Sequence, residues 1–71
     1  MTNKGIKNAV AVCKEMAIEH MRNRWYWMQY DKYEVDDFNA IHIYFTSHYR
    51  MCHYVFMANK GEWKIKTVVY G

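Results

Sequence analysis

The chain has 71 residues, a length that suits one domain and excludes a second one. It is 52% hydrophobic and 18% aromatic, which excludes a disordered chain because this much apolar surface can offset the entropy lost on folding. The formal net charge of +3 permits a nucleic-acid partner without requiring one, and it is too small for a dedicated nucleic-acid-binding arm.

The first predicted element is a helix between residue 4 and about residue 23. Its apolar side chains recur every three or four residues, and they are Ile6, Ala9, Val10, Cys13, Met16, Ala17 and Met21. At about 100° per residue these positions share one side of a helix, so the pattern predicts an amphipathic helix with one buried side. His20 also lies on that side, where we expect a neutral ring hydrogen-bonded to the backbone or to a tyrosine.

The segment that follows the helix has two interpretations. Trp27 and Met28 would face inward if the helix continued to about Tyr30, whereas the aromatic residues at 25–30 equally favour a strand. Residues 31–39 contain several Asp and Asn residues, which predicts a connector with a turn.

Three strands follow the connector. Ile41, Ile43 and Phe45 alternate with more polar residues, which predicts a half-buried strand over 41–46. Further strands are expected over 49–58 and 62–70, separated by a turn at residues 59–61. The expected fold class is therefore α+β, a single domain over residues 1–71. One N-terminal amphipathic helix packs on an antiparallel sheet of three strands in the order αβββ, or of four if residues 25–30 are extended.

The length of the last turn decides which side of the middle strand faces the helix. A three-residue loop at 59–61 leaves Cys52, Tyr54 and Phe56 on the uncovered face, whereas a two-residue loop leaves Met51, His53, Val55 and Met57 there. We favour the three-residue loop, because Lys60 is poorly suited to the positive φ of a tight two-residue turn.

The uncovered face is where the sequence places a function. With the favoured loop, its aromatic and basic residues are the expected partner-binding set, namely Tyr44, Tyr54, Phe56, Lys64, Lys66 and Tyr70. Rigid tyrosine anchors with a basic rim suit an acidic protein partner. We therefore expect a small non-catalytic protein that occludes or modulates a larger macromolecule, with the economy of size of phage-type inhibitors of a host enzyme or defence complex.

Other uses of the same face remain open. Stacking rings beside lysines also suit single-stranded nucleic acid, which is the alternative function. Cross-strand aromatic pairs could instead simply cover the sheet or form a homodimer contact. A secondary candidate is the acidic connector, which could pair with basic groups of a partner through Asp31, Glu34, Asp36 and Asp37.

The sequence argues against a metal, a cofactor or an enzyme. Cys52 and His53 point to opposite faces of a strand, and no paired spacing typical of zinc ligands occurs. Neither cysteine has the setting of an activated nucleophile, and no glycine-rich phosphate loop is present. We therefore expect no metal, no cofactor and no catalytic residues.

The cysteine content and hydropathy indicate a compartment. Two cysteines are too few for the disulfide framework of a small secreted domain, and no signal-peptide pattern occurs. No apolar run approaches the roughly 18 residues of a membrane span. We expect a cytoplasmic protein with no membrane partner.

Overall fold

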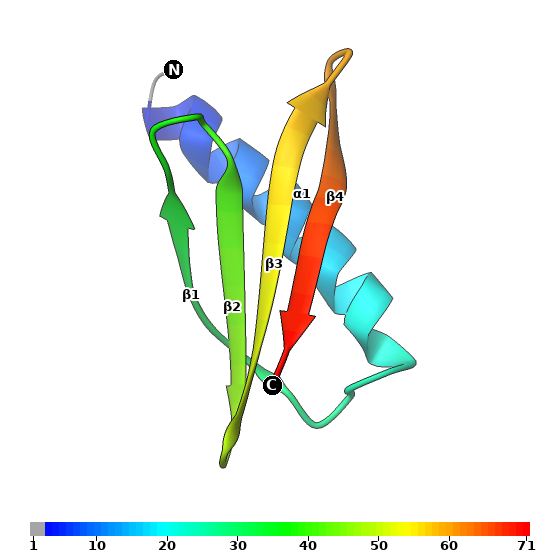
Figure 1. Ribbon diagram of the computed structural model, residues 1–71. Coiled ribbons are helices and arrows are strands. Elements are labelled where there is room, and N and C mark those ends of the chain that lie inside the picture. Colours follow the sequence, from blue (N-terminus) through cyan, green and yellow to red (C-terminus); the bar gives the residue numbers. More distant parts are fainter. Residues whose placement is uncertain (1–2) are drawn as a thin grey trace.

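The computed structural model describes residues 3–71, with side chains from residue 5 onward. Helix α1 spans Asn3–Arg22 and is followed by strands β1 (Gln29–Val35), β2 (Ile41–Ser47), β3 (Arg50–Asn59) and β4 (Glu62–Tyr70). The strands form one antiparallel sheet in the order β1-β2-β3-β4, and α1 crosses behind it (Figure 1). The α+β class, the helix and the antiparallel sheet are confirmed, and the sheet has four strands.

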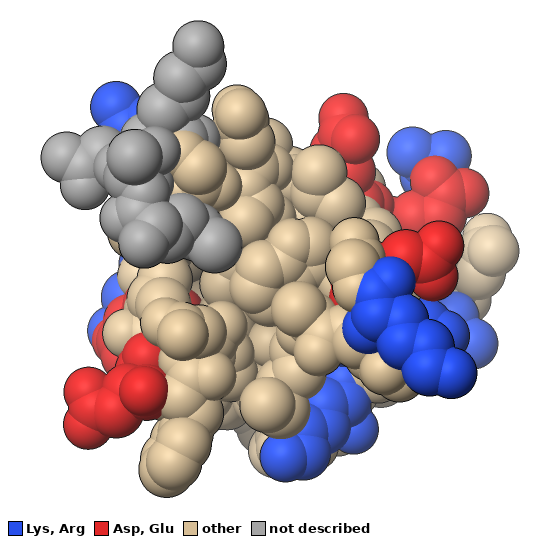
Figure 2. All heavy atoms as spheres, turned by 90° about the horizontal axis from the view of Figure 1, so that it is seen from above, with Lys and Arg blue, Asp and Glu red and all other residues tan. Residues whose placement is uncertain are grey.

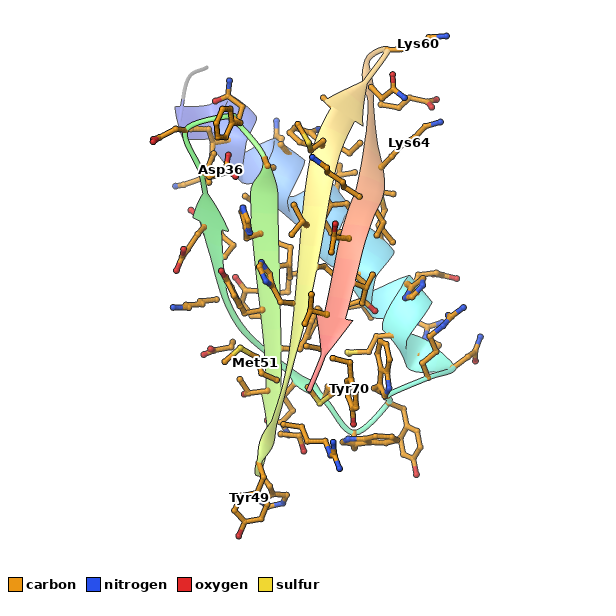
Figure 3. The ribbon with its side chains drawn as sticks, in the orientation of Figure 1. Asp36, Tyr49, Met51, Lys60, Lys64 and Tyr70 are labelled. Atoms are coloured by element: carbon orange, nitrogen blue, oxygen red, sulfur yellow. The ribbon has the colours of Figure 1, made fainter. Side chains whose placement is uncertain are left out.

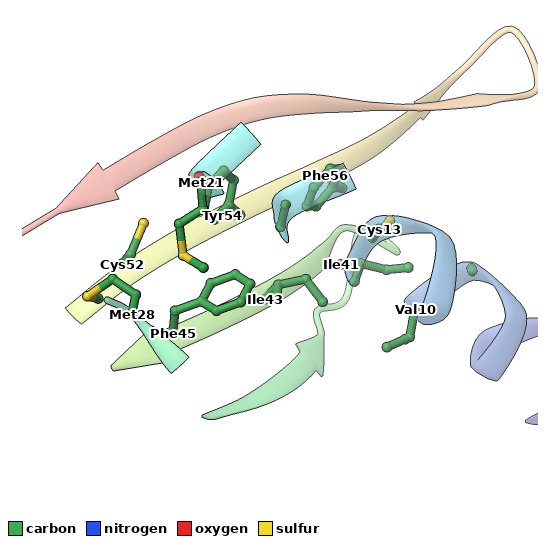
Figure 4. Close-up of a cluster of buried hydrophobic side chains, with 12 residues drawn as sticks. Val10, Cys13, Met21, Met28, Ile41, Ile43, Phe45, Cys52, Tyr54 and Phe56 are labelled. Carbon is green, nitrogen blue, oxygen red and sulfur yellow. The ribbon is translucent and has the colours of Figure 1, made fainter. Parts of the chain in front are cut away.

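The helix buries the side that its sequence pattern predicts. Ala9, Val10, Cys13, Ala17 and Met21 are all buried, at spacings of one, three and four residues along α1. Their stripe forms the core cluster of Figure 4 with side chains of β2 and β3, and partly buried side chains of β4 pack against this cluster. Removing this surface from water is the main stabilising contribution to such a fold.

The segment between α1 and β1 follows neither predicted alternative in full. The helix ends in a turn in which the amides of Arg24 and Trp25 both bond to the carbonyl of Met21, at 2.9 and 2.8 Å. The Arg24 guanidinium also donates to the carbonyl of His20 at 2.7 Å, which satisfies one of the free carbonyls at the helix end. Extended structure begins only at Gln29, so the first strand lies largely within the predicted connector.

The turn between β3 and β4 is a two-residue turn, and the three-residue prediction is wrong. Asn59 pairs with Glu62, leaving Lys60 and Gly61 as the loop, with φ values of 55° and 81°. Two successive positive φ values define a type I′ turn, whose twist matches that of the flanking strands. The better match to the strand twist outweighs the modest cost of a left-handed lysine.

This turn sets the orientation of β3. Cys52, Tyr54 and Phe56 face α1 and are fully buried, whereas Met51, His53, Val55 and Met57 face away from it. The core residues of β3 are labelled in Figure 4 beside Ile41, Ile43 and Phe45 of β2. The alternative loop length thus gives the correct side for every residue of this strand.

A bulge changes the alternation along β4. The pairing with β3 shifts between Val55 and Phe56, so that Phe56 opposes Ile65 and Val55 opposes Thr67. Lys66 is the extra residue, and it is exposed. Beyond the bulge, Val68 and Tyr70 pack toward the core, and the prediction that Tyr70 lies on the uncovered face with Lys66 is wrong.

Candidate functional site

The face of the sheet turned away from α1 is called the open face from here on. Pairing and alternation place on it Lys32, Glu34, His42, Tyr44, Thr46, Met51, His53, Val55, Met57, Lys64, Thr67 and Val69. Figure 3 looks onto this face, with Met51 labelled on β3 and Lys64 on β4. Among the described residues, no second layer covers these side chains.

Apolar side chains occupy much of β3 and β4 on the open face. Met51 is 49% exposed and Val69 is 55% exposed, and Val55 and Met57 are half-buried between neighbouring strands. Val69 pairs with His53, and Met51 lies two residues before His53 on the same face. The apolar surface is therefore continuous with the rings at the centre of the sheet.

Three aromatic rings are stacked across β2 and β3. Tyr44 and His53 face each other with centroids 4.4 Å apart and planes 13° apart, and His42 lies 4.9 Å from His53 at 26°. Tyr44 stands directly opposite Lys32 on one side and His53 on the other, and the Lys32 Nζ lies 5.2 Å from its ring centroid. Both faces of the Tyr44 ring are thus occupied within the protein.

A hydrogen-bonded chain runs from the β1–β2 turn into this ring cluster. Asp36 Oδ2 lies 2.9 Å from His42 Nε2, and His42 Nδ1 lies 2.7 Å from His53 Nε2. Asp36 Oδ1 accepts the amides of Phe38 at 2.8 Å and Ala40 at 3.0 Å. One carboxylate therefore holds both the turn and the first histidine ring.

Hydrogen bonds and burial shift the pKa of two groups in this hydrogen-bonded chain. The hydrogen bond from His42, followed by the two backbone amides, holds the pKa of Asp36 below its ordinary value. Burial and then the nearby His42 ring lower the pKa of His53, partly opposed by Glu34. The lowered pKa of His53 favours its neutral form near pH 7.

The hydrogen-bonded series Asp36–His42–His53 resembles the groups that orient a general base in an enzyme, but it lies on a flat surface. An Asp that orients one histidine against another can fix which nitrogen carries the proton. Here, however, Tyr44 covers one face of the His53 ring and His42 engages its Nε2, and the hollows beside α1 are lined by other residues. One hollow of about 290 Å³ lies between α1 and β1 and is lined by Met21, Tyr30 and Phe45, among others.

Metal ligands and membrane spans can be assessed within the described part of the chain. In residues 5–71, no group of three or more His, Cys, Asp or Glu side chains is arranged to hold a metal ion. Both cysteines are buried on the helix side of the sheet and are unpaired, and burial raises the pKa of Cys13 to about 11. Residues 3–71 contain no helix with the length and apolar character needed to cross a bilayer.

The structure separates the predicted partner-binding residues into three groups. Tyr44 and Lys64 lie on the open face, as predicted. Tyr54 and Phe56 are 0% exposed, so their placement on the uncovered face is wrong, because the two-residue turn orients them toward α1. Tyr70 is half-buried on the helix side, where it stacks on Trp25 at 4.5 Å and 7°. Lys66 is exposed at the β4 bulge.

The acidic candidates are spread over different surroundings. Asp31 is the extra residue of a bulge in β1, and Glu34 lies on the open face 3.2 Å from the Nζ of Lys32. Asp36 is half-buried in the hydrogen-bonded chain, whereas Asp37 is exposed. The structure therefore does not bring the four together as one acidic surface.

The favoured sequence interpretation misses several open-face residues. They are Met51, His53, Val55, Met57, Thr67 and Val69. The two-residue alternative names the β3 members of this set, but nothing in the local sequence marks the bulge that turns Val69 outward. No protein-family model, no curated protein and no solved structure matches this chain.

Proposed function

We propose that this chain is a non-catalytic binding protein that places its open face on a larger protein partner and acts by occluding or modulating it. The observation that carries this proposal is the uncovered face itself, with its apolar and ring-stacked centre. Met and aromatic residues are enriched at the centres of protein interfaces, and charged residues are depleted there. Uncovered apolar patches on small folded proteins commonly mark such interfaces.

Charges surround this centre unevenly. Lys60 and Lys64 point outward at the same end of the sheet as Asp36 but at the other edge (Figure 3). Lys66 lies further along β4. At the end of the molecule seen from above, which is perpendicular to the open face, uncharged atoms occupy the middle and Lys, Arg, Asp and Glu lie toward the periphery (Figure 2). A partner with an apolar patch beside acidic groups would place those groups over β4.

The positions of the tyrosines favour a protein over a nucleic acid. A base needs a free ring face on which to stack. Both faces of Tyr44 are taken by Lys32 and His53, and Tyr54 is buried in the core. The open face therefore offers apolar contact area more readily than a stacking platform.

The mode of action that fits this surface is occlusion. A flat patch can cover an active site or a binding site of a larger protein without any chemistry of its own. Inhibition of a host enzyme or defence complex by a phage-type protein is the biological setting that we propose for it.

The proposal is tested with charge insertions into the open face. We expect Met51→Glu and Val69→Glu to weaken partner binding at least about tenfold, because each buries a carboxylate in the interface. Val12→Glu on α1 is the matched control, since Val12 is 47% exposed, close to Met51 at 49%. The partner is first captured from source-cell extract by the wild-type chain and then titrated, purified, against all three variants.

Three results would overturn the proposal. In the first, the titrations show equal binding by the open-face variants and Val12→Glu. In the second, no captured protein binds the purified chain. In the third, labelled single-stranded DNA binds at submicromolar concentration, with affinity that falls steeply with salt and is lost in Tyr44→Ala. Thermal unfolding of each variant establishes that the variant is folded.

A further inference from the structure

Strand β1 is an exposed edge of the sheet. All seven of its residues are exposed, and α1 packs mainly over β2 and β4, with Lys14 over the Tyr30 ring at 3.9 Å as a contact to β1. On the helix side, Tyr33 is 42% exposed and Val35 is 39% exposed. An uncovered edge offers a row of free backbone donors and acceptors to another strand.

The two edges of the sheet differ in how well they resist such pairing. Strand β4 carries Lys64 and Lys66 and has a bulge at Lys66, and both the lysines and the bulge oppose edge-to-edge contact. The bulge of β1 lies at Asp31, so residues 32–35 keep a regular register with β2. Within this regular segment the charges alternate in sign, from Lys32 to Glu34.

We propose that β1 pairs with β1 of a second copy of this chain, antiparallel and about a two-fold axis at Tyr33. In this register Lys32 lies opposite Glu34 of the second copy, and the reverse contact follows from the symmetry. Lys32 Nζ already lies 3.2 Å from Glu34 Oε1 within one chain. The four charges therefore alternate around a square, with each lysine flanked by two carboxylates.

The other face of the joined strands has an aromatic pair at its centre. Tyr33 meets Tyr33 of the second copy across the axis, and aromatic cross-strand pairs stabilise antiparallel sheets. Ile6, Tyr33 and Val35 line a hollow beside this edge, which gives the added side chains a surface to contact.

The dimer joins two four-stranded sheets into one continuous sheet. Strands that pair antiparallel about a perpendicular two-fold axis keep corresponding faces on the same side. The two open faces then form one larger surface. The dimer does not depend on the proposed function, because it is formed by the edge of the sheet rather than by the open face.

Charge reversal tests the register directly. Sedimentation velocity over a range from about 10 μM to about 1 mM should show a concentration-dependent dimer of the wild-type chain. Lys32→Glu and Glu34→Lys should each weaken it at least about tenfold, because each places four like charges together. The double variant restores alternation and should return to within about threefold of wild type. Lys64→Glu on β4 is the matched control and should leave the dimer unchanged.

A disulfide supplies a second test that does not depend on the charge variants. Tyr33→Cys should form a disulfide-linked dimer under mild oxidation, because the two positions meet at the axis. Val35→Cys should not, because the two copies of residue 35 lie several residues apart in this register. A monomeric wild-type chain at all concentrations, a double variant that stays monomeric, or equal cross-linking at both positions would each overturn the proposal.

Discussion

Tyr54 shows how one polar group is accommodated in this small core. Its ring is 0% exposed and lies edge-on to His20, with centroids 5.4 Å apart at 83°. Its hydroxyl lies 2.8 Å from His20 Nδ1, which satisfies both groups. The expectation that His20 hydrogen-bonds to a tyrosine or to the backbone is thereby confirmed.

The same contact explains why the sequence assigns Tyr54 to the wrong face. Tyrosine suits an exposed interface and a buried position equally well, provided that its hydroxyl has a partner. Here the partner lies 34 residues away on α1. A local alternation pattern carries no information about a contact at that distance, and β3 is apolar on both sides.

We predict that the free energy of unfolding falls as pH is lowered from about 7 to about 5. Burial, followed by Arg24, lowers the pKa of His20, and burial followed by His42 lowers that of His53. The unfolded chain, with ordinary histidine pKa values near 6.5, therefore binds more protons in this range. Urea unfolding at a series of pH values measures the effect.

A pair of variants separates this effect from general acid sensitivity. His20→Gln should reduce the slope of stability against pH, whereas His48→Gln, which alters an exposed residue, should leave it unchanged. An unchanged slope in His20→Gln would contradict the role of this ring. Below about pH 4 we expect a further loss of folding stability, because the pKa of Asp36 is lowered in the folded state and the unfolded chain therefore binds more protons.

At the scale of elements, the Lys60–Gly61 turn determines which residues reach the open face. Its two positive φ values require a left-handed lysine followed by a left-handed glycine. The sequence marks the turn clearly, but its length depends on a balance of about 1 kcal/mol between the lysine conformation and the strand twist. That balance cannot be resolved from residue preferences alone.

We predict that Lys60→Asn stabilises the protein by about 0.5 kcal/mol and that Gly61→Ala destabilises it by about 1 kcal/mol. Asparagine adopts the left-handed conformation at lower cost than lysine, whereas alanine at φ 81° is strained even though open space surrounds Gly61. Gly71→Ala is the matched control, because an added Cβ there also meets open space without a positive φ. Urea midpoints provide the measurement, and equal effects of the two alanine substitutions would contradict this account.

Strand β1 could not be predicted from the sequence pattern, for a different reason. A strand exposed on both faces has no apolar alternation, and the run from Asp31 to Glu34 has the polarity of a loop. Its extended state depends on hydrogen bonds to β2, not on burial. Strands β2, β3 and β4 were predictable because each has residues that face a core, and their expected ranges are confirmed within about one residue.

At the scale of the whole molecule, the reactivity of the two cysteines measures how often their shared core opens. Cys13 from α1 and Cys52 from β3 are both 0% exposed, and burial raises the pKa of each thiol. A thiol reagent therefore reaches them only when the structure opens.

We predict that both cysteines react slowly in native buffer and at similar rates. Low concentrations of urea should accelerate the two reactions in parallel, since opening of the shared core limits both. Mass spectrometry of peptides after timed labelling distinguishes the sites. Rapid labelling of Cys52 beside a protected Cys13 would contradict the burial of Cys52. It would instead support the orientation of β3 that a three-residue loop predicts, with Cys52 on the uncovered face.

The position of α1 in the chain has a consequence for synthesis. The helix is synthesised before the strands, yet the side chains that cover its apolar stripe come from β2, β3 and β4. A helix of 20 residues with no partner is marginal in water. The stacking of Tyr70 on Trp25 joins the end of β4 to the segment that follows α1. Stable folding of α1 is therefore delayed until the three later strands, including β4, have been translated.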